Sequence, residues 1–367
     1  MKQPLLVVFY LLLCFSLYSQ EEEKKHYSFE ADYFYGNVYE HNPDISHLIT
    51  GHPNGLLLSY NRNTFGIEEW ERQYSSPDFG VSFIYQDMKE PSLGDHYGLY
   101  GHYNFYLLKR HFMISVGTGL SYNTNPYSVD NNFENNAYGS AILSTTFLRF
   151  NYVYNNIWKG LGFHTGLLFV HYSNANIKAP NTSTNTLALN VGLTYQLDYE
   201  ELPEYNRERD GLDYSEKIKY NFVFRYGINE SDIIGLGQHP FYVFSAFADK
   251  RLNYKSTVQA GVDLFLSEFL KDVIKFNSIA YPEEGTTGDE DYKRVGLFVG
   301  HDLRFNKVSF VSQIGYYVYW PYEFEKRVYL RVGLKRYFYK DKIFAAITLK
   351  SHWAQAEAVE FGIGVRL

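Results

Sequence analysis

Apolar residues alternate with small or polar residues in long runs over most of the chain. From Leu187 onward, every second residue of segment 187–197 is apolar, and the residues between them are small or polar. Segments 295–305, 328–335 and 359–367 repeat this pattern. Because successive side chains of a strand point to opposite faces, a period of two predicts β-strands with one apolar face each.

Helical periodicity is rare by comparison. The best candidate for a helix is the short segment 266–276. After the N-terminal segment, no stretch reaches the roughly 18 consecutive apolar residues of a membrane-spanning helix, so the sequence predicts none.

Two folds suit strands with one apolar face. A soluble sandwich buries that face against a second sheet, whereas a transmembrane barrel turns it toward lipid. Three features favour the barrel. The alternating runs hold roughly 10 to 14 residues, where strands usually hold about 5 or 6. Aromatic residues gather at a strand end, as in an interfacial girdle, and the chain closes in strict alternation. The clustered aromatics are Tyr316, Tyr317, Tyr319 and Trp320.

The connections support a barrel and suggest its size. Short polar turns are expected at 109–111, 250–253, 306–307 and 340–342, and longer loops at 123–139, 229–240 and 268–293. We predict an all-β, antiparallel outer-membrane barrel of about fourteen to sixteen strands. Segments 64–77 and 200–216 are long for the turns of such a barrel. Since we find no internal repeat and no linker, we predict one domain over residues 20–367.

The N-terminal segment has the features of an export signal. Lys2 precedes an unbroken apolar run, Leu5–Leu13, and Ser19 is a small residue at a plausible cleavage point. An apolar core this short, with these flanks, is typical of a secretory signal rather than of a membrane anchor. We therefore predict a signal peptide at residues 1–19 and a place in the outer membrane of a bacterium.

Composition and charge exclude several other classes of protein. Aromatic residues make up 19% of the chain, which excludes a disordered protein. The formal net charge of −7 makes nucleic acid an unsuitable partner. The single cysteine cannot pair within the chain, which excludes a small fold held together by disulfides. The sequence has no GxSxG, HExxH, P-loop or GxGxxG motif, and its 12 histidines show no ligand spacing. We predict neither a metal nor a cofactor.

One strand ends in residues that could perform chemistry. In the predicted strand 158–172, the bulkier alternate row leads through Leu167 and Phe169 to His171 and Ser173, and we assign this row to lipid. Two such residues lie about 6.6 Å apart at Cα on one face of a strand. A neutral imidazole can then accept the proton of the serine hydroxyl and create a nucleophile.

The end of this strand and the loop after it contain a specific run of residues: His171, Ser173, Asn174, Ala175, Lys178, Pro180 and Asn181. This run resembles the motif of a known family of outer-membrane barrels, the PagL-type lipid A 3-O-deacylases, and is close to sequences described as acyloxyacyl hydrolases. The similarity covers roughly residues 155–199. The resemblance implies a serine esterase that removes an ester-linked acyl chain from lipid A, the lipid anchor of lipopolysaccharide.

The resemblance also implies roles for individual residues. His171 would be the base and Ser173 the nucleophile. Asn174, with nearby backbone amides, would form the oxyanion hole. Asn176 stands where some members carry glycine, which bears on the geometry of that hole.

The third member of the catalytic set departs from the family. A carboxylate is expected fourteen residues after the histidine, and that position here is Asn185. An amide oxygen can orient the imidazole, but it does not stabilise the imidazolium as a charge does. Lys178 is a candidate contact for a lipid phosphate.

Two further interpretations remain open. A catalytically silent barrel could act as a pore or as a structural protein. Candidates for residues that face its lumen are Arg304, Arg331, Asp302 and Gln313. A soluble envelope sandwich that binds a ligand is the third alternative.

Overall fold

Antiparallel strands make up most of the structure. The computed structural model describes residues 24–209, 214–353 and 355–367, so the signal peptide predicted at residues 1–19 lies outside the described part. Sixteen strands are present among the described residues. In this part of the chain, no helix has the length and apolar character needed to cross a membrane.

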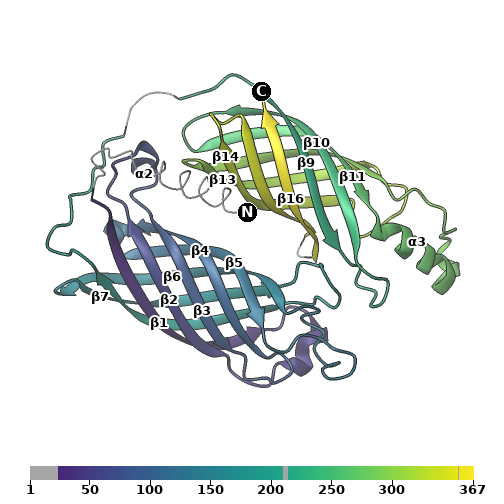
Figure 1. Cartoon of the computed structure of the whole chain (residues 1–367), viewed down its shortest axis with the longest axis horizontal. Coiled ribbons are helices and arrows are strands. Elements are labelled where there is room, and N and C mark those ends of the chain that lie inside the picture. The colour runs from purple at the N-terminus through teal and green to yellow at the C-terminus, as the bar shows by residue number, and fades with distance from the viewer. Residues whose placement is uncertain (1–23, 210–213, 354) are drawn as a thin grey trace, which may run out of the picture.

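The first eight strands close into one barrel (Figure 1). Each strand pairs with the next in the chain, and β8 returns to pair with β1 from Ser28↔Gln196 to Tyr39↔Asn185. The strands are β1 (His26–Tyr39), β2 (Asn54–Asn63), β3 (Asp78–Asp87), β4 (Asp95–Leu107), β5 (Phe112–Asn123), β6 (Ile142–Trp158), β7 (Leu161–Ser173) and β8 (Thr184–Gln196).

The last eight strands close into a second barrel, in which β16 pairs with β9. Figure 1 shows it in green and yellow, apart from the purple and blue strands of the first barrel. The strands are β9 (Lys219–Asn229), β10 (His239–Arg251), β11 (Ser256–Ser267), β12 (Arg294–Phe305), β13 (Val308–Tyr319), β14 (Val328–Phe338), β15 (Ile343–His352) and β16 (Gln355–Arg366).

The structure confirms the all-β antiparallel barrel fold and a strand number within the predicted range. It corrects the arrangement, because the strands form two cylinders of eight and not one wide cylinder. Residues 197–218, which include the overlong segment 200–216, connect the two barrels. The single barrel domain expected over residues 20–367 is thus wrong, since each half satisfies the hydrogen bonds of its own first and last strands.

The two ends of each barrel differ in their connections. We call the end with the longer connections the loop end and the opposite end the turn end. At the loop end lie η1 (Pro43–Leu48), α3 (Phe269–Ala280) and η3 (Pro282–Glu284). At the turn end lie η2 (Leu108–Arg110) and α2 (Glu69–Gln73), which occupies the long connection 64–77. The predicted helix 266–276 corresponds to α3.

The two barrels point in the same direction. At the loop end, Asn176 Nδ2 of the first barrel donates to the carbonyl of Ala356 in the second, at 2.7 Å. At the turn end, the hydroxyl of Tyr74 donates to the carbonyl of Arg304 at 3.1 Å, and its ring lies 4.6 Å from that of Phe305. Loops therefore meet loops and turns meet turns, and the elements of Figure 1 agree with this.

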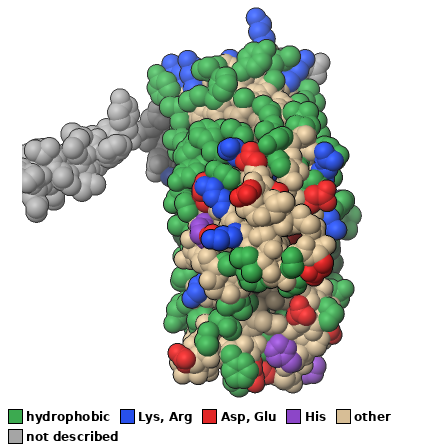
Figure 2. Space-filling model, turned by 90° about the vertical axis from the view of Figure 1, so that its right-hand side faces the viewer, with side chains coloured by type: hydrophobic (Ala, Val, Ile, Leu, Met, Phe, Trp, Pro, Cys, Tyr) green, Lys and Arg blue, Asp and Glu red, His purple; other side chains and the backbone are tan. Residues whose placement is uncertain are grey.

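The predicted apolar rows lie on the outside of both barrels. In β8, Leu189 is 69% exposed, and in β16, Ile363 is 61% exposed, while the residues between the members of each row are mostly buried. Figure 2, which looks onto the loop end, shows hydrophobic side chains along the margins and charged side chains over the middle. Both barrels thus present an apolar wall with polar residues at the end.

The interiors hold buried ion pairs. Arg149 pairs with Asp32 at 2.8 Å in the first barrel, and Arg331 pairs with Asp263 at 2.8 Å in the second. An eight-stranded barrel is just wide enough for its side chains to fill it. The described residues form two barrels of eight strands, so a pore through a single barrel of fourteen to sixteen strands loses its basis. The four candidates for lumen-facing residues are all buried: Arg304, Arg331, Asp302 and Gln313.

Candidate active site

The hairpin of β7 and β8 places His171 directly opposite Asn185. The register pairs Leu161 with Tyr195 at one end and carries this alignment to His171↔Asn185 near the loop end. Directly opposed residues of an antiparallel pair have Cβ atoms about 5 Å apart. The His171 Nδ1 and Asn185 Oδ1 atoms are accordingly 2.7 Å apart.

This contact defines which nitrogen of His171 is basic. An amide oxygen only accepts hydrogen bonds. His171 Nδ1 therefore carries a proton and donates a hydrogen bond to Asn185 Oδ1. The other nitrogen, Nε2, then keeps its lone pair. Asn185 thus orients the imidazole as a proton acceptor without supplying a negative charge.

His171 and Ser173 continue the outer row of β7. The burial pattern of the strand buries Leu168, Val170 and Tyr172 completely, and it leaves the alternate row partly or largely exposed as far as His171. Ser173 shares that row, although the loop beyond it reduces its exposure to 6%.

The hydroxyl of Ser173 is held by its own loop. It donates to Asn181 Oδ1 at 3.1 Å and accepts a hydrogen bond from the backbone N–H of Ala175 at 2.9 Å. Among the described residues, no hydrogen bond joins Ser173 to His171. Hydrogen bonds between nucleophile and base are often long or missing before substrate binds. Asn181 belongs to the family motif, but sequence reasoning had assigned it no role.

The loop turns back sharply after Ser173. Ala175 and Asn176 have φ angles of 54° and 59°, a left-handed conformation that is uncommon for residues other than glycine. This turn directs the N–H of Ala175 toward the serine oxygen. Strained backbone of this kind concentrates at functional sites.

The two asparagines predicted for the oxyanion hole use their amide groups within the structure. Asn174 Nδ2 donates to the carbonyl of Lys178 at 2.5 Å, and Asn176 Nδ2 donates to Ala356. The backbone N–H of Ala175 is therefore the donor that lies nearest to the Ser173 oxygen. The oxyanion roles of Asn174 and Asn176 stay predictions.

The second barrel braces this loop through Glu230 and Gln238. The Glu230 carboxylate accepts a hydrogen bond from Ala179 N at 3.0 Å, and its backbone N–H donates to the carbonyl of Asn176 at 2.8 Å. Gln238 Nε2 donates to the carbonyl of Ile177 at 2.7 Å. No sequence signal indicated these contacts, because they join loops of different barrels.

The carboxyl group of Asp232 lies at the edge of the same contact. Asp232 Oδ1 is 3.4 Å from Asn176 Nδ2, and Asp232 Oδ2 accepts from Gln355 at 3.1 Å. Burial raises the pKa of Asp232 above its ordinary value. Lys178 is exposed at the tip of the loop, where its ammonium group can meet a ligand.

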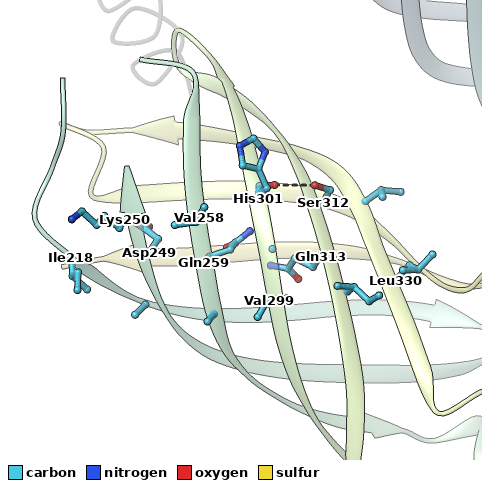
Figure 3. A pocket seen from close by; sticks show the side chains of 15 residues that line it. Ile218, Asp249, Lys250, Val258, Gln259, Val299, His301, Ser312, Gln313 and Leu330 are labelled. Atoms are coloured by element: carbon cyan, nitrogen blue, oxygen red, sulfur yellow. Dashed lines mark hydrogen bonds between the residues drawn. The ribbon is translucent and has the colours of Figure 1, made fainter. Parts of the chain in front are cut away.

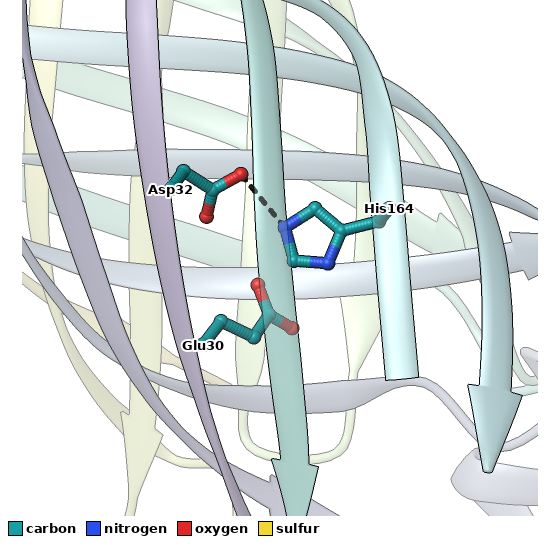
Figure 4. A group of neighbouring side chains, drawn as sticks. All are labelled: Glu30, Asp32 and His164. Carbon is teal, nitrogen blue, oxygen red and sulfur yellow. Dashed lines mark hydrogen bonds and ion pairs between the residues drawn. The ribbon is translucent and has the colours of Figure 1, made fainter. Parts of the chain in front are cut away.

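A second group of polar residues lies on the other face of β7. Glu30, Asp32 and His164 bring potential metal ligands within 4.8 Å of one another (Figure 4). His164 Nε2 is 2.7 Å from Asp32 Oδ1, and Arg149 pairs with both carboxylates. Because Arg149 already pairs with both carboxylates and all these side chains are buried, we assign the group to the packed interior.

A broad apolar depression lies elsewhere, on the outer wall of the second barrel (Figure 3). Its volume is about 740 Å³, and exposed side chains such as Val258 and Val299 line it beside His301 and Ser312. The hydroxyl of Ser312 donates to the carbonyl of His301 at 3.2 Å. Its lining suits hydrocarbon, and the polar groups of the β7–β8 loop take no part in it.

Family models match both halves of the chain. Residues 54–194 match the model described as lipid A 3-O-deacylase (PagL), and residues 218–367 match the acyloxyacyl hydrolase C-terminal domain. The two matches therefore correspond to the two barrels. No curated protein matches the chain.

Solved porin structures align with the chain at low scores. A variant of the Rh. blastica porin is 9% identical, with a TM-score of 0.20, and the alignment covers 94% of this chain and 100% of that chain. A triple variant of the Rhodopseudomonas blastica porin is 10% identical, with the same score and coverage. Similarity this low carries no conclusion about this chain.

Proposed function

The chain belongs to the family of lipid A 3-O-deacylases and acyloxyacyl hydrolases, and from this premise we propose that it is a serine esterase of the outer membrane. Its substrate is lipid A, and its reaction is the hydrolysis of one ester-linked acyl chain. The catalytic residues are Ser173 and His171, oriented by Asn185.

One observation carries this proposal. His171 and Ser173 continue an apolar row on the outside of a closed barrel, at its loop end. A polar pair in that position faces the headgroup region of the surrounding lipid when the barrel spans a membrane. An acyl ester of lipid A lies near this depth, so it can reach the serine without leaving the bilayer.

In the proposed reaction, substrate binding brings the Ser173 hydroxyl from Asn181 to His171 Nε2. The Ser173 oxygen attacks the ester carbonyl carbon, while its proton passes to His171 Nε2. The N–H of Ala175 donates to the oxygen that becomes negative. The tetrahedral intermediate then collapses and expels the sugar alkoxide, which takes the proton from His171. An acyl-serine remains. Water, deprotonated by His171, then releases the fatty acid and restores the serine.

The orientation of both barrels supports an outer-membrane location. Their apolar walls suit lipid, and their loop ends lie on the same side. Short turns on the periplasmic side and longer loops outside are the pattern of outer-membrane barrels. The loop end then lies in the outer leaflet, where lipid A resides.

The function is tested by the mass of lipid A. Bacteria that express the chain are expected to yield lipid A that has lost one ester-linked acyl chain, as measured by mass spectrometry of the extracted lipid. Cells with the empty vector provide the control. Unchanged lipid A in cells that hold the folded protein in their outer membrane would contradict the proposal and favour a structural barrel.

Replacing Asn185 with glutamate is expected to raise the rate of deacylation. A carboxylate 2.7 Å from Nδ1, where the amide oxygen now lies, would stabilise the imidazolium that forms during the reaction. Exchanging such a carboxylate for an amide costs a triad about 10⁴ in rate, so a gain of up to that size is available. Initial rates of fatty acid release measure it.

Asn185→Gln is the matched control for this change. It has the length of glutamate without the charge, so it separates charge from side-chain length. Equal rates for the glutamate and glutamine variants would exclude an electrostatic role for position 185.

A further inference from the structure

A basic cavity opens at the turn end of the first barrel, far from the candidate active site. It has a volume of about 330 Å³ and lies between α2, η2 and the segment that connects the barrels. None of its lining residues is acidic. Five of them are basic: Arg72, Lys109, Arg110, Arg207 and Arg209.

Three of these cations have no carboxylate partner in the described part of the chain. Arg72 pairs with Glu69 at 2.7 Å, and Arg110 pairs with Asp78 at 2.9 Å. No ion pair with a described residue is formed by Lys109, Arg207 or Arg209, so the cavity keeps a net positive charge. Like charges that gather without a counter-charge repel one another, and an anion in their midst relieves that repulsion.

Aromatic and backbone contacts fix the position of Arg110. Its guanidinium lies 3.6 Å from the ring centre of Tyr106 and 4.7 Å from that of Tyr205. It also donates to the carbonyl of Ser76 at 2.7 Å. A guanidinium held in this way loses little freedom when a ligand binds.

The backbone around the cavity is strained at five residues other than glycine. Leu108, Lys109 and Arg110 have consecutive φ angles of 49°, 56° and 69°, and two further lining residues, Ser75 and Ser76, have φ angles of 60° and 53°. Left-handed residues of this kind persist where the surrounding structure enforces them, and they cluster at ligand sites. The strained backbone therefore lies at the same cavity as the unpaired basic side chains.

From these features we infer that the cavity binds a phosphate group. Guanidinium groups match phosphate oxygens in charge and geometry, and a lysine adds a point charge. The phosphate belongs either to the headgroup of an anionic phospholipid in the leaflet at the turn end or to a free phosphate compound. This site is additional to the esterase and does not depend on it.

Two binding measurements on the full chain distinguish the sources of phosphate. Titration calorimetry in neutral detergent measures the affinity for inorganic phosphate. Native mass spectrometry measures retention of phosphatidylglycerol after reconstitution with phosphatidylcholine and phosphatidylglycerol. Binding of phosphate alone identifies a soluble ligand, and retention of phosphatidylglycerol alone identifies a headgroup; either result supports the site.

Charge removal shows whether the binding belongs to this cavity. The combined variant Lys109→Gln, Arg207→Gln and Arg209→Gln is expected to bind about tenfold more weakly, since charge-assisted hydrogen bonds are lost. The matched control removes three exposed lysines from the turn end of the second barrel, with Lys307→Gln, Lys340→Gln and Lys342→Gln. Absence of binding in both measurements, or an equal loss in the two variants, overturns the inference.

Discussion

Replacing Ser173 with alanine is expected to abolish lipid A deacylation while the barrels stay intact. The substitution removes the only atom that attacks the ester, so the rate should fall by about 10³-fold or more. Within the described part of the chain, the Ser173 hydroxyl bonds only to groups of its own loop, Asn181 and the N–H of Ala175. Its removal should therefore disturb this loop and leave the pairing of the barrel strands unchanged. Mass spectrometry of lipid A measures the activity, and heat-modifiable migration in gels reports folding.

Ser183→Ala is the matched control for this loss. Ser183 lies in the same loop, and its hydroxyl contacts the imidazole of His41 at 3.3 Å. Its removal should leave most of the activity in place. If the Ser173→Ala variant retained comparable activity, the nucleophile would have to be another group, and the proposed mechanism would be wrong.

Replacing Arg149 with methionine is expected to destabilise the first barrel strongly. Arg149 is fully buried and is the cation that pairs with both Glu30 and Asp32. Removing one partner from a buried ionic group leaves uncompensated charge and costs about 3–5 kcal/mol. Urea unfolding in lipid vesicles, followed by the tryptophan fluorescence of the whole protein, measures the loss.

Two further variants make this test specific. Arg336→Met removes an exposed arginine from β14 and should change the free energy of unfolding by less than about 0.5 kcal/mol. Adding Glu30→Gln and Asp32→Asn to Arg149→Met removes the unpaired charge and should restore much of the stability. Equal effects of Arg149→Met and Arg336→Met would show that the buried ionic group contributes nothing.

Alternation in the sequence was sufficient to predict individual strands and their faces. Leu167, on the row assigned to lipid, is 46% exposed, whereas Leu168 is fully buried. The row predicted for His171 is likewise the outer one. These features are local, because the direction of a side chain in a strand depends only on its place in the alternation.

Closure of the barrels could not be predicted in the same way. Alternation is identical in a barrel of eight strands and in one of sixteen, and what separates them is the pairing of β8 with β1, as in Ser28↔Gln196. That pairing joins positions far apart in the sequence. The overlong segment 200–216 was the one local sign of it, since a connection between barrels needs more residues than a turn.

The site was predicted in its chemical residues but not in its supports. His171, Ser173 and Asn185 lie on one hairpin, so spacing and family resemblance were enough to propose them as catalytic residues. Glu230 reaches the loop from the other barrel, and nothing in the pattern around it indicates that contact. Contacts between the loops of two different barrels leave no repeating pattern in the sequence.

The second barrel supplies contacts that hold the loop between β7 and β8, so the candidate site is complete only in the whole folded protein. The side-chain amide of Asn176 donates to Ala356 and the backbone N–H of Ala179 donates to Glu230, and both acceptors come later in the chain. On the proposed function, we therefore expect esterase activity to appear only after both barrels have closed and the loop has its full set of contacts.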